Sequence, residues 1–143
     1  MKILAIVFLV VSFFGFLDAT YLTTEYYLGA IPSCVITVGC GTVLASEWHA
    51  IWGIPVALLG AIYYLLFFLL TVAYLSSGRE SLIILAASVA SMGFLASLWF
   101  VYLQLFVIGE ICFYCMISAV TSTTLFITGL FVLYTYKKSK NIV

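Results

Sequence analysis

The chain has 143 residues, of which 66% are hydrophobic and 7% are charged, and its formal net charge is zero. Soluble globular domains carry about 25% charged residues, so this composition excludes an ordinary soluble domain. With five basic residues in all, the chain also gives no reason to expect a nucleic-acid partner. The composition is typical of an integral membrane protein.

Four apolar stretches predict four membrane-spanning helices, because one span needs about 20 apolar residues. In chain order they cover residues 3–28, 53–75, 82–108 and 111–136. They use most of the length, so we expect a single all-α domain over residues 1–143, a four-transmembrane-helix bundle. Asp18 and Glu25 interrupt the first stretch. Asp18 should avoid lipid, either by a hydrogen bond to a neighbouring helix or as part of a proton path or site wall.

The first connection, residues 29–52, is predicted to be an outer loop that carries the chemistry. Gly29 and Pro32 end the first helix. Thr42 can begin a short interfacial helix over Val43–His49, between the first and second spans.

The basic residues predict the orientation. Lys2 precedes the first span, Arg79 lies between the second and third, and three lysines follow the fourth. Four spans bring these positions to one side, which the positive-inside rule makes cytoplasmic. We therefore expect a multi-pass plasma-membrane protein with both termini in the cytoplasm and the outer loop outside. A cleavable signal peptide is disfavoured, because residues 16–20 fit the Ala-x-Ala pattern of a cleavage site poorly.

The four cysteines are the candidates for catalysis. Cys34 and Cys40 lie on the outer loop, and Cys112 and Cys115 lie where the fourth span begins. The predicted topology gathers all four at the outer face, where disulfides persist. Cys112 and Cys115 share one face of the first helical turn, and the partial positive charge of a helix N-terminus favours thiolate. The loop pair, flanked by glycines, could exchange disulfides with a soluble protein and with Cys112.

Four cysteines allow three pairings. We expect Cys34–Cys40 with Cys112–Cys115 at rest, and Cys40–Cys112 as the intermediate of transfer. Two static structural disulfides remain an alternative. A four-cysteine zinc site is disfavoured because five residues separate the first pair, so no metal is expected. His49, the single histidine, is either an interfacial residue or a hydrogen-bond donor to a quinone oxygen.

These residues resemble the vitamin K epoxide reductase family, and in particular its prokaryotic branch. The resemblance covers essentially the whole chain and rests on the order of the four spans and on four motifs: Cys34…Cys40, Val43-Leu44-Ala45-Ser46, Ile51-Trp52-Gly53-Ile54-Pro55-Val56 and Cys112-Phe113-Tyr114-Cys115.

The resemblance implies a role for each site residue. Cys34 and Cys40 would be a shuttle pair that takes electrons from a thioredoxin-fold, DsbA-like protein. Cys40 would attack Cys112, releasing Cys115 as the thiolate that faces a quinone of the menaquinone, ubiquinone or vitamin K type. Three further residues would surround that quinone: Ser46, His49 and, as an aromatic wall, Trp52.

Two departures from the family pattern affect the prediction of which substrate the protein reduces. The loop cysteines are closer together than in the vertebrate enzymes, and Ala119 stands where those enzymes have a tyrosine. We expect the thioredoxin-fold partner to be a separate protein. The resulting expectation is a quinone-dependent membrane thiol-disulfide oxidoreductase that supports disulfide formation. The alternatives are a vitamin K quinone or epoxide reductase, and a non-enzymatic membrane subunit stapled by disulfides.

Overall fold

The structure is a computed structural model that describes residues 1–31, 34 and 39–142. In chain order its elements are α1 (Lys2–Leu28), α2 (Cys40–Ala45), the 3₁₀ turn η1 (Glu47–His49), β1 (Ala50–Ile51), β2 (Ile54–Pro55), α3 (Val56–Ser77), α4 (Glu80–Tyr102), the π-helical segment η2 (Leu103–Ile108) and α5 (Phe113–Ile142). Among the described residues, four helical stretches are long and apolar enough to cross a membrane: α1, α3, α4 continued by η2, and α5. The prediction of an all-α bundle with four spanning helices is confirmed.

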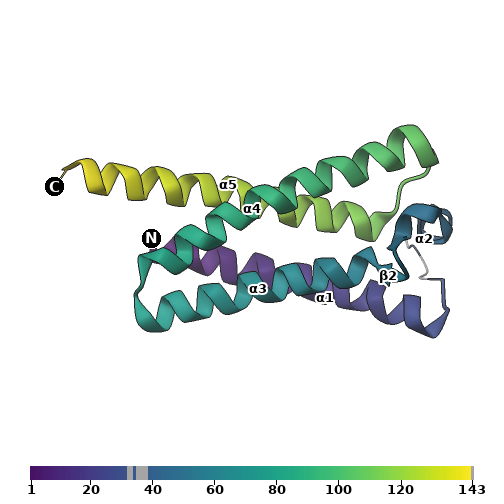
Figure 1. The fold of residues 1–143 in the computed structure, drawn as a ribbon, viewed down its shortest axis with the longest axis horizontal. Coiled ribbons are helices and arrows are strands. Elements are labelled where there is room, and N and C mark those ends of the chain that lie inside the picture. The colour runs from purple at the N-terminus through teal and green to yellow at the C-terminus, as the bar shows by residue number, and fades with distance from the viewer. Residues whose placement is uncertain (32–33, 35–38, 143) are drawn as a thin grey trace.

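The helices pack mainly as two antiparallel pairs, α1 with α3 and α4 with α5, and α1 also contacts α5. The N-terminus, the α3–α4 turn and the C-terminus lie toward one end of the bundle, whereas α2, the strands and the start of α5 lie at the other (Figure 1). We call the first the basic end, because all five Lys and Arg residues fall there, and the second the cysteine end.

A small hairpin makes the second span begin later than predicted, at Val56 instead of residue 53. Ala50 pairs with Pro55 and Ile51 with Ile54 in an antiparallel ladder. The two turn residues, Trp52 and Gly53, have φ values of 52° and 79°. Positive φ at both central positions is the geometry of a type I′ turn, which Asn-Gly usually signals. Because a Trp-Gly turn lacks that signal, the sequence does not predict the hairpin.

Other boundaries also differ from the sequence prediction. The short outer helix begins at Cys40 and not at Val43, with Gly39 as its N-cap, and η1 follows it. The last helix begins at Phe113 and continues to Ile142, past the predicted residue 136, because lysine is compatible with helix. Within the predicted outer loop, residues 32–33 and 35–38 lie outside the described residues.

Tyr64 on α3 joins three helices in the core. Its ring lies over Gly15 of α1, where an added Cβ would sit 2.5 Å from the ring. Its hydroxyl donates to the carbonyl oxygen of Ser118 (2.8 Å) and lies 2.7 Å from Thr121 Oγ1, both on α5. A small residue at the crossing is what lets helices approach this closely in a membrane.

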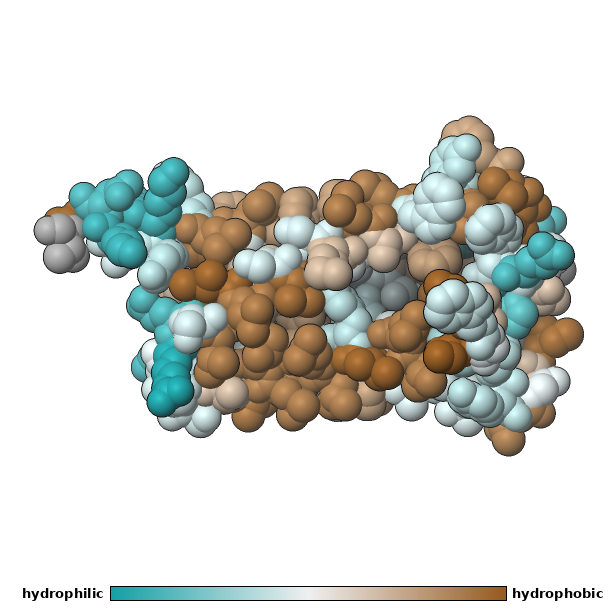
Figure 2. All heavy atoms as spheres, in the orientation of Figure 1, coloured by the Kyte–Doolittle hydropathy of each residue, from teal (hydrophilic) through white to brown (hydrophobic). Residues whose placement is uncertain are grey.

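The outer surface of the bundle suits a lipid environment. Large apolar side chains such as Leu66, Leu95 and Leu130 are about half exposed. Figure 2 shows an apolar belt around the middle of the molecule, with hydrophilic residues gathered toward the two ends. This is the distribution of a multi-pass membrane protein.

Candidate active site

The two cysteine pairs are in different states. Cys34 and Cys40 are joined by a disulfide, with their Cα atoms 5.9 Å apart. Cys112 and Cys115 are free thiols, so the second disulfide expected at rest is not formed.

Cys40 and Cys112 pack in one buried cluster at the cysteine end, together with Val43. Cys34 and Cys115 pack against that cluster. Gly39 makes the close approach possible, because a Cβ added there would lie only 2.7 Å from the carbonyl oxygen of Ile111. The start of α2 and the start of α5 are therefore in direct contact, and one sulfur from each pair lies in the contact region.

Gln104 holds the backbone of Cys112. The Cys112 N–H donates to Oε1 of Gln104 at 2.9 Å, and the Cys112 carbonyl accepts from the N–H of Met116 at 3.1 Å as the helix begins. Gln104 is buried and lies on the π-helical segment η2, a kind of segment often found at functional sites. Its side chain thus ties the end of the third span to the start of the fourth.

Cys112 lies just before α5, outside the spanning helices. A hydrogen bond from Cys115 to its sulfur lowers the pKa of the Cys112 thiol, and this effect exceeds that of burial, which raises the pKa. Because the thiolate is the reactive form, Cys112 is suited to exchange with the outer pair beside it.

A cavity of about 460 Å³ lies inside the bundle, under α2 and η1. Cys115 lines it, and its walls are mostly apolar. Leu59 of α3 and Met92 of α4 also line it, yet they are 45% and 70% exposed, so the cavity opens sideways between these helices. Figure 2 shows the opening as a hollow within the apolar belt. A molecule dissolved in the membrane could enter by this route.

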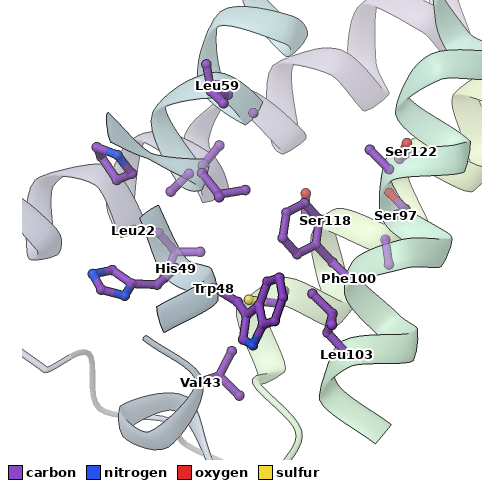
Figure 3. A pocket seen from close by; sticks show the side chains of 18 of the residues that line it. Leu22, Val43, Trp48, His49, Leu59, Ser97, Phe100, Leu103, Ser118 and Ser122 are labelled. Carbon is purple, nitrogen blue, oxygen red and sulfur yellow. The ribbon is translucent and has the colours of Figure 1, made fainter. Parts of the chain in front are cut away.

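Of the three residues predicted to surround a quinone, two line the cavity and one does not. Ser46 and His49 line the cavity with Cys115, but Trp52 does not. Trp52 is 99% exposed at the tip of the hairpin turn, and Trp48 contributes the indole in the cavity wall. Figure 3 shows Trp48 directed toward Phe100 and the His49 ring on the other side.

Ser46 and His49 are already engaged in local hydrogen bonds. The Ser46 hydroxyl donates to the carbonyl oxygen of Val43 at 2.6 Å. The His49 ring donates from Nδ1 to the Ser46 carbonyl oxygen and packs against Tyr26, with the ring centroids 5.3 Å apart. These bonds shape the turn between α2 and η1 and leave each residue less free to bind another oxygen.

Sequence reasoning missed several polar residues of the cavity wall, among them Tyr63, Gln104 and Ser122. A single amide within an apolar span was a usable signal for Gln104, since such groups are costly in a membrane unless they have a role. Ser122 gave no such signal, because neighbouring hydroxyls such as Thr121 and Thr123 bond back to their own helix. Tyr63 resembles any other aromatic residue of a span.

Comparison with known proteins shows to which family the chain is similar. The sequence profile of the Vitamin K epoxide reductase family (VKOR) matches residues 6–130. A curated protein of Arabidopsis thaliana, the thiol-disulfide oxidoreductase LTO1, is 32% identical over 122 residues, which cover 77% of this chain and 31% of that protein. The chain therefore spans about a third of the length of this relative.

Proposed function

Because the chain belongs to the vitamin K epoxide reductase family, we propose that it is a membrane thiol-disulfide oxidoreductase. It would pass electrons from a thioredoxin-fold, DsbA-like protein at the cysteine end to a quinone in the membrane. The supporting observation is that Cys40 packs beside Cys112 while Cys115 lines a cavity open to the apolar belt. One end of the molecule thus joins an outer thiol pair to a lipid-accessible space.

The cavity residues fit a quinone. Apolar walls suit its ring and tail, a sideways opening suits a molecule held in lipid, and Cys115 provides sulfur at the wall. When bound, the quinone would supply an acceptor for two electrons and two protons. Family membership and these features support the assignment of Cys34, Cys40, Cys112 and Cys115 as the electron path.

The chain's own steps begin at the outer pair. A thiolate of the partner attacks the Cys34–Cys40 disulfide, and the partner's second thiol resolves the mixed disulfide. The partner leaves oxidised, and Cys34 and Cys40 become thiols. In these thiol-disulfide exchanges two electrons pass from the sulfur atoms of the partner to those of Cys34 and Cys40, and no other oxidant is needed.

Transfer to the inner pair follows when that pair is oxidised. The Cys40 thiolate attacks the sulfur of Cys112, and Cys115 leaves as a thiolate. Cys34 then attacks Cys40, which re-forms the Cys34–Cys40 disulfide and releases Cys112. The product has the outer pair oxidised and the inner pair reduced, as in the structure. With an acceptor bound beside Cys115, the inner pair would give up two electrons and two protons and return to the Cys112–Cys115 disulfide.

The test is an anaerobic reaction of the purified protein with a reduced thioredoxin-fold protein and a quinone, followed as quinol formation. Cys115→Ala should abolish quinol formation, because the inner disulfide cannot form. It should leave Cys34 and Cys40 able to exchange with the partner, measured by mass spectrometry of the trapped mixed disulfide. Quinol formation at the parent rate in this variant would refute the electron path.

The same assay addresses the two alternatives. Supplying vitamin K epoxide in place of quinone tests the reductase alternative by its product, and Ala119 in the cavity wall offers no hydroxyl to favour it. A stapled structural subunit needs two stable disulfides, whereas the proposed enzyme needs disulfides that exchange with a thioredoxin-fold protein. Resistance of both pairs to mild reductant would favour that alternative.

A further inference from the structure

Three polar atoms in the cavity wall make no well-formed hydrogen bond within the protein, although the Tyr63 and Ser122 side chains lie close enough to influence each other. They are Asp18 Oδ2 on α1, the Tyr63 hydroxyl on α3 and Ser122 Oγ on α5. Within residues 1–31, 34 and 39–142, no other side-chain nitrogen or oxygen atom is both buried and without a hydrogen bond. All three residues line the same cavity. They form what we call the inner polar cluster.

Such a cluster is costly unless something binds to it. A buried donor or acceptor left without a partner costs about 1–3 kcal/mol, and nearly all such groups in native proteins are satisfied. Three of them from three different helices line one cavity, so a molecule held there can supply their hydrogen-bond partner. Because the remaining walls are mostly apolar, that molecule should be largely apolar with a polar group at this position.

Ser122, the member of the cluster on α5, lies deeper in the bundle than the reactive sulfur. Ser122 follows Cys115 by seven residues on α5, which places it two turns farther along the same helix face, about 10 Å along the axis. Figure 3 shows Ser118 and Ser122 on the side of the cavity opposite His49. A ring in contact with Cys115 would therefore direct its far end toward the cluster.

The cluster is held by close packing. The Tyr63 hydroxyl lies against Gly93 of α4, where an added Cβ would overlap it, and the Tyr63 ring contacts Tyr64 and Phe67 with centroids 5.2 and 5.0 Å away. Ser122 is only 2% exposed. These contacts keep the Tyr63 and Ser122 hydroxyls in place without a ligand.

Asp18 completes the cluster as a hydrogen-bond donor. All basic residues lie at the basic end, so no Lys or Arg within the spans can pair with it. A carboxyl without a cation in an apolar interior is expected in its neutral form, which carries one O–H. Ser46 and His49 lie near the other end of the cavity, and each already donates a hydrogen bond to a backbone carbonyl oxygen.

We propose that Asp18, Tyr63 and Ser122 form an inner subsite that donates hydrogen bonds to the quinone oxygen farther from Cys115. The inference rests on the proposed function and assigns it a second contact with the same ligand. The apolar walls would hold the ring, Cys115 would face one end of it, and the inner polar cluster would fix the other end. The three residues are thus positioning residues for the acceptor.

The test measures binding and not turnover. The oxidised protein in detergent is titrated with menadione, a two-carbonyl naphthoquinone without a tail, by calorimetry. Asp18→Leu, Tyr63→Phe and Ser122→Ala should each weaken binding about 5- to 10-fold, the effect of one lost hydrogen bond. Asp18→Asn keeps an N–H donor and should bind within about twofold of the parent. The infrared carbonyl band of bound menadione should shift in the parent and less in the three donor-free variants.

Controls remove similar groups elsewhere. Glu25→Leu removes a carboxyl on the same helix outside the cavity wall, and Ser88→Ala removes a hydroxyl bonded to the Ile84 carbonyl on an exposed face. Both should bind menadione like the parent. Exchange of Cys34 and Cys40 with the partner checks that each variant is folded, and Ser122→Ala, the smallest change, carries the test if Asp18→Leu does not fold.

Each outcome decides between the proposals. If the parent binds menadione and the donor-free variants bind equally well, the inner subsite is wrong and the proposed function stands. If the parent does not bind menadione, both the quinone assignment and the subsite are wrong. If Asp18→Asn binds as weakly as Asp18→Leu, Asp18 does not act as a neutral donor, and that role is refuted.

Discussion

Gln104 is the residue on which the geometry of the inner pair most depends. Gln104→Met keeps the shape of the side chain but removes the oxygen that accepts from the Cys112 N–H. A buried N–H left without a partner costs about 1–3 kcal/mol, so we expect a lower melting temperature and slower reduction of the Cys112–Cys115 disulfide by the outer pair. Gln104→Glu retains an acceptor and is the control. A methionine variant that matches the parent in both measurements would show that Gln104 does not position Cys112.

The sequence identified those site residues whose role follows from their spacing along the chain. The Cys-x-x-Cys pair at a helix start and the loop pair stand out by spacing alone. Trp48 and Trp52 do not, because their exposure depends on the positive φ of the turn at Trp52 and Gly53. Which hydroxyl lacks a partner, as at Ser122, depends on contacts between helices and has no local signature.

At the scale of elements, the contact of α2 with the start of α5 is the feature that joins the two redox pairs. Gly39→Ala would place a Cβ 2.7 Å from the Ile111 carbonyl oxygen, which neither backbone can easily relieve. We expect α2 to move away from α5 and disulfide transfer from the outer to the inner pair to slow at least about tenfold, since exchange needs contact between the sulfurs. Stopped-flow measurement of inner-pair reduction tests this.

Gly41→Ala is the matched control for that prediction. Its Cβ would approach only the Cγ2 atom of Ile31, at 3.1 Å, and a side chain can shift. Transfer in this variant should remain near the parent rate. Equal rates in Gly39→Ala and Gly41→Ala would mean that the close backbone contact is not needed for transfer.

The spanning helices were predictable as elements because each is a long apolar stretch, but their ends were not. The sequence predicted a helix from residue 53, whereas the hairpin closes over residues 50–55 before α3 begins. Likewise, the π-helical segment that carries Gln104 continues the apolar pattern of α4 and cannot be distinguished from it by periodicity.

At the scale of the whole molecule, the two ends of the bundle have different tasks. The basic end carries all the Lys and Arg residues, and the positive-inside rule predicts that it faces the cytoplasm. The cysteine end would then face the compartment where disulfides form. Between them the apolar belt contains the cavity opening, so the proposed electron path runs from an aqueous face to the membrane interior within one small bundle.

The most direct test of this account traps the link between the two pairs. In a Cys34→Ser/Cys115→Ser double variant, only Cys40 and Cys112 remain, the two sulfurs that share a buried cluster. Mild oxidation should join them in an intramolecular disulfide, seen as one cross-linked peptide pair by mass spectrometry and lost on reduction. If both cysteines instead remain free to alkylation after oxidation, or link only between molecules, the outer and inner pairs do not meet and the proposed relay is contradicted.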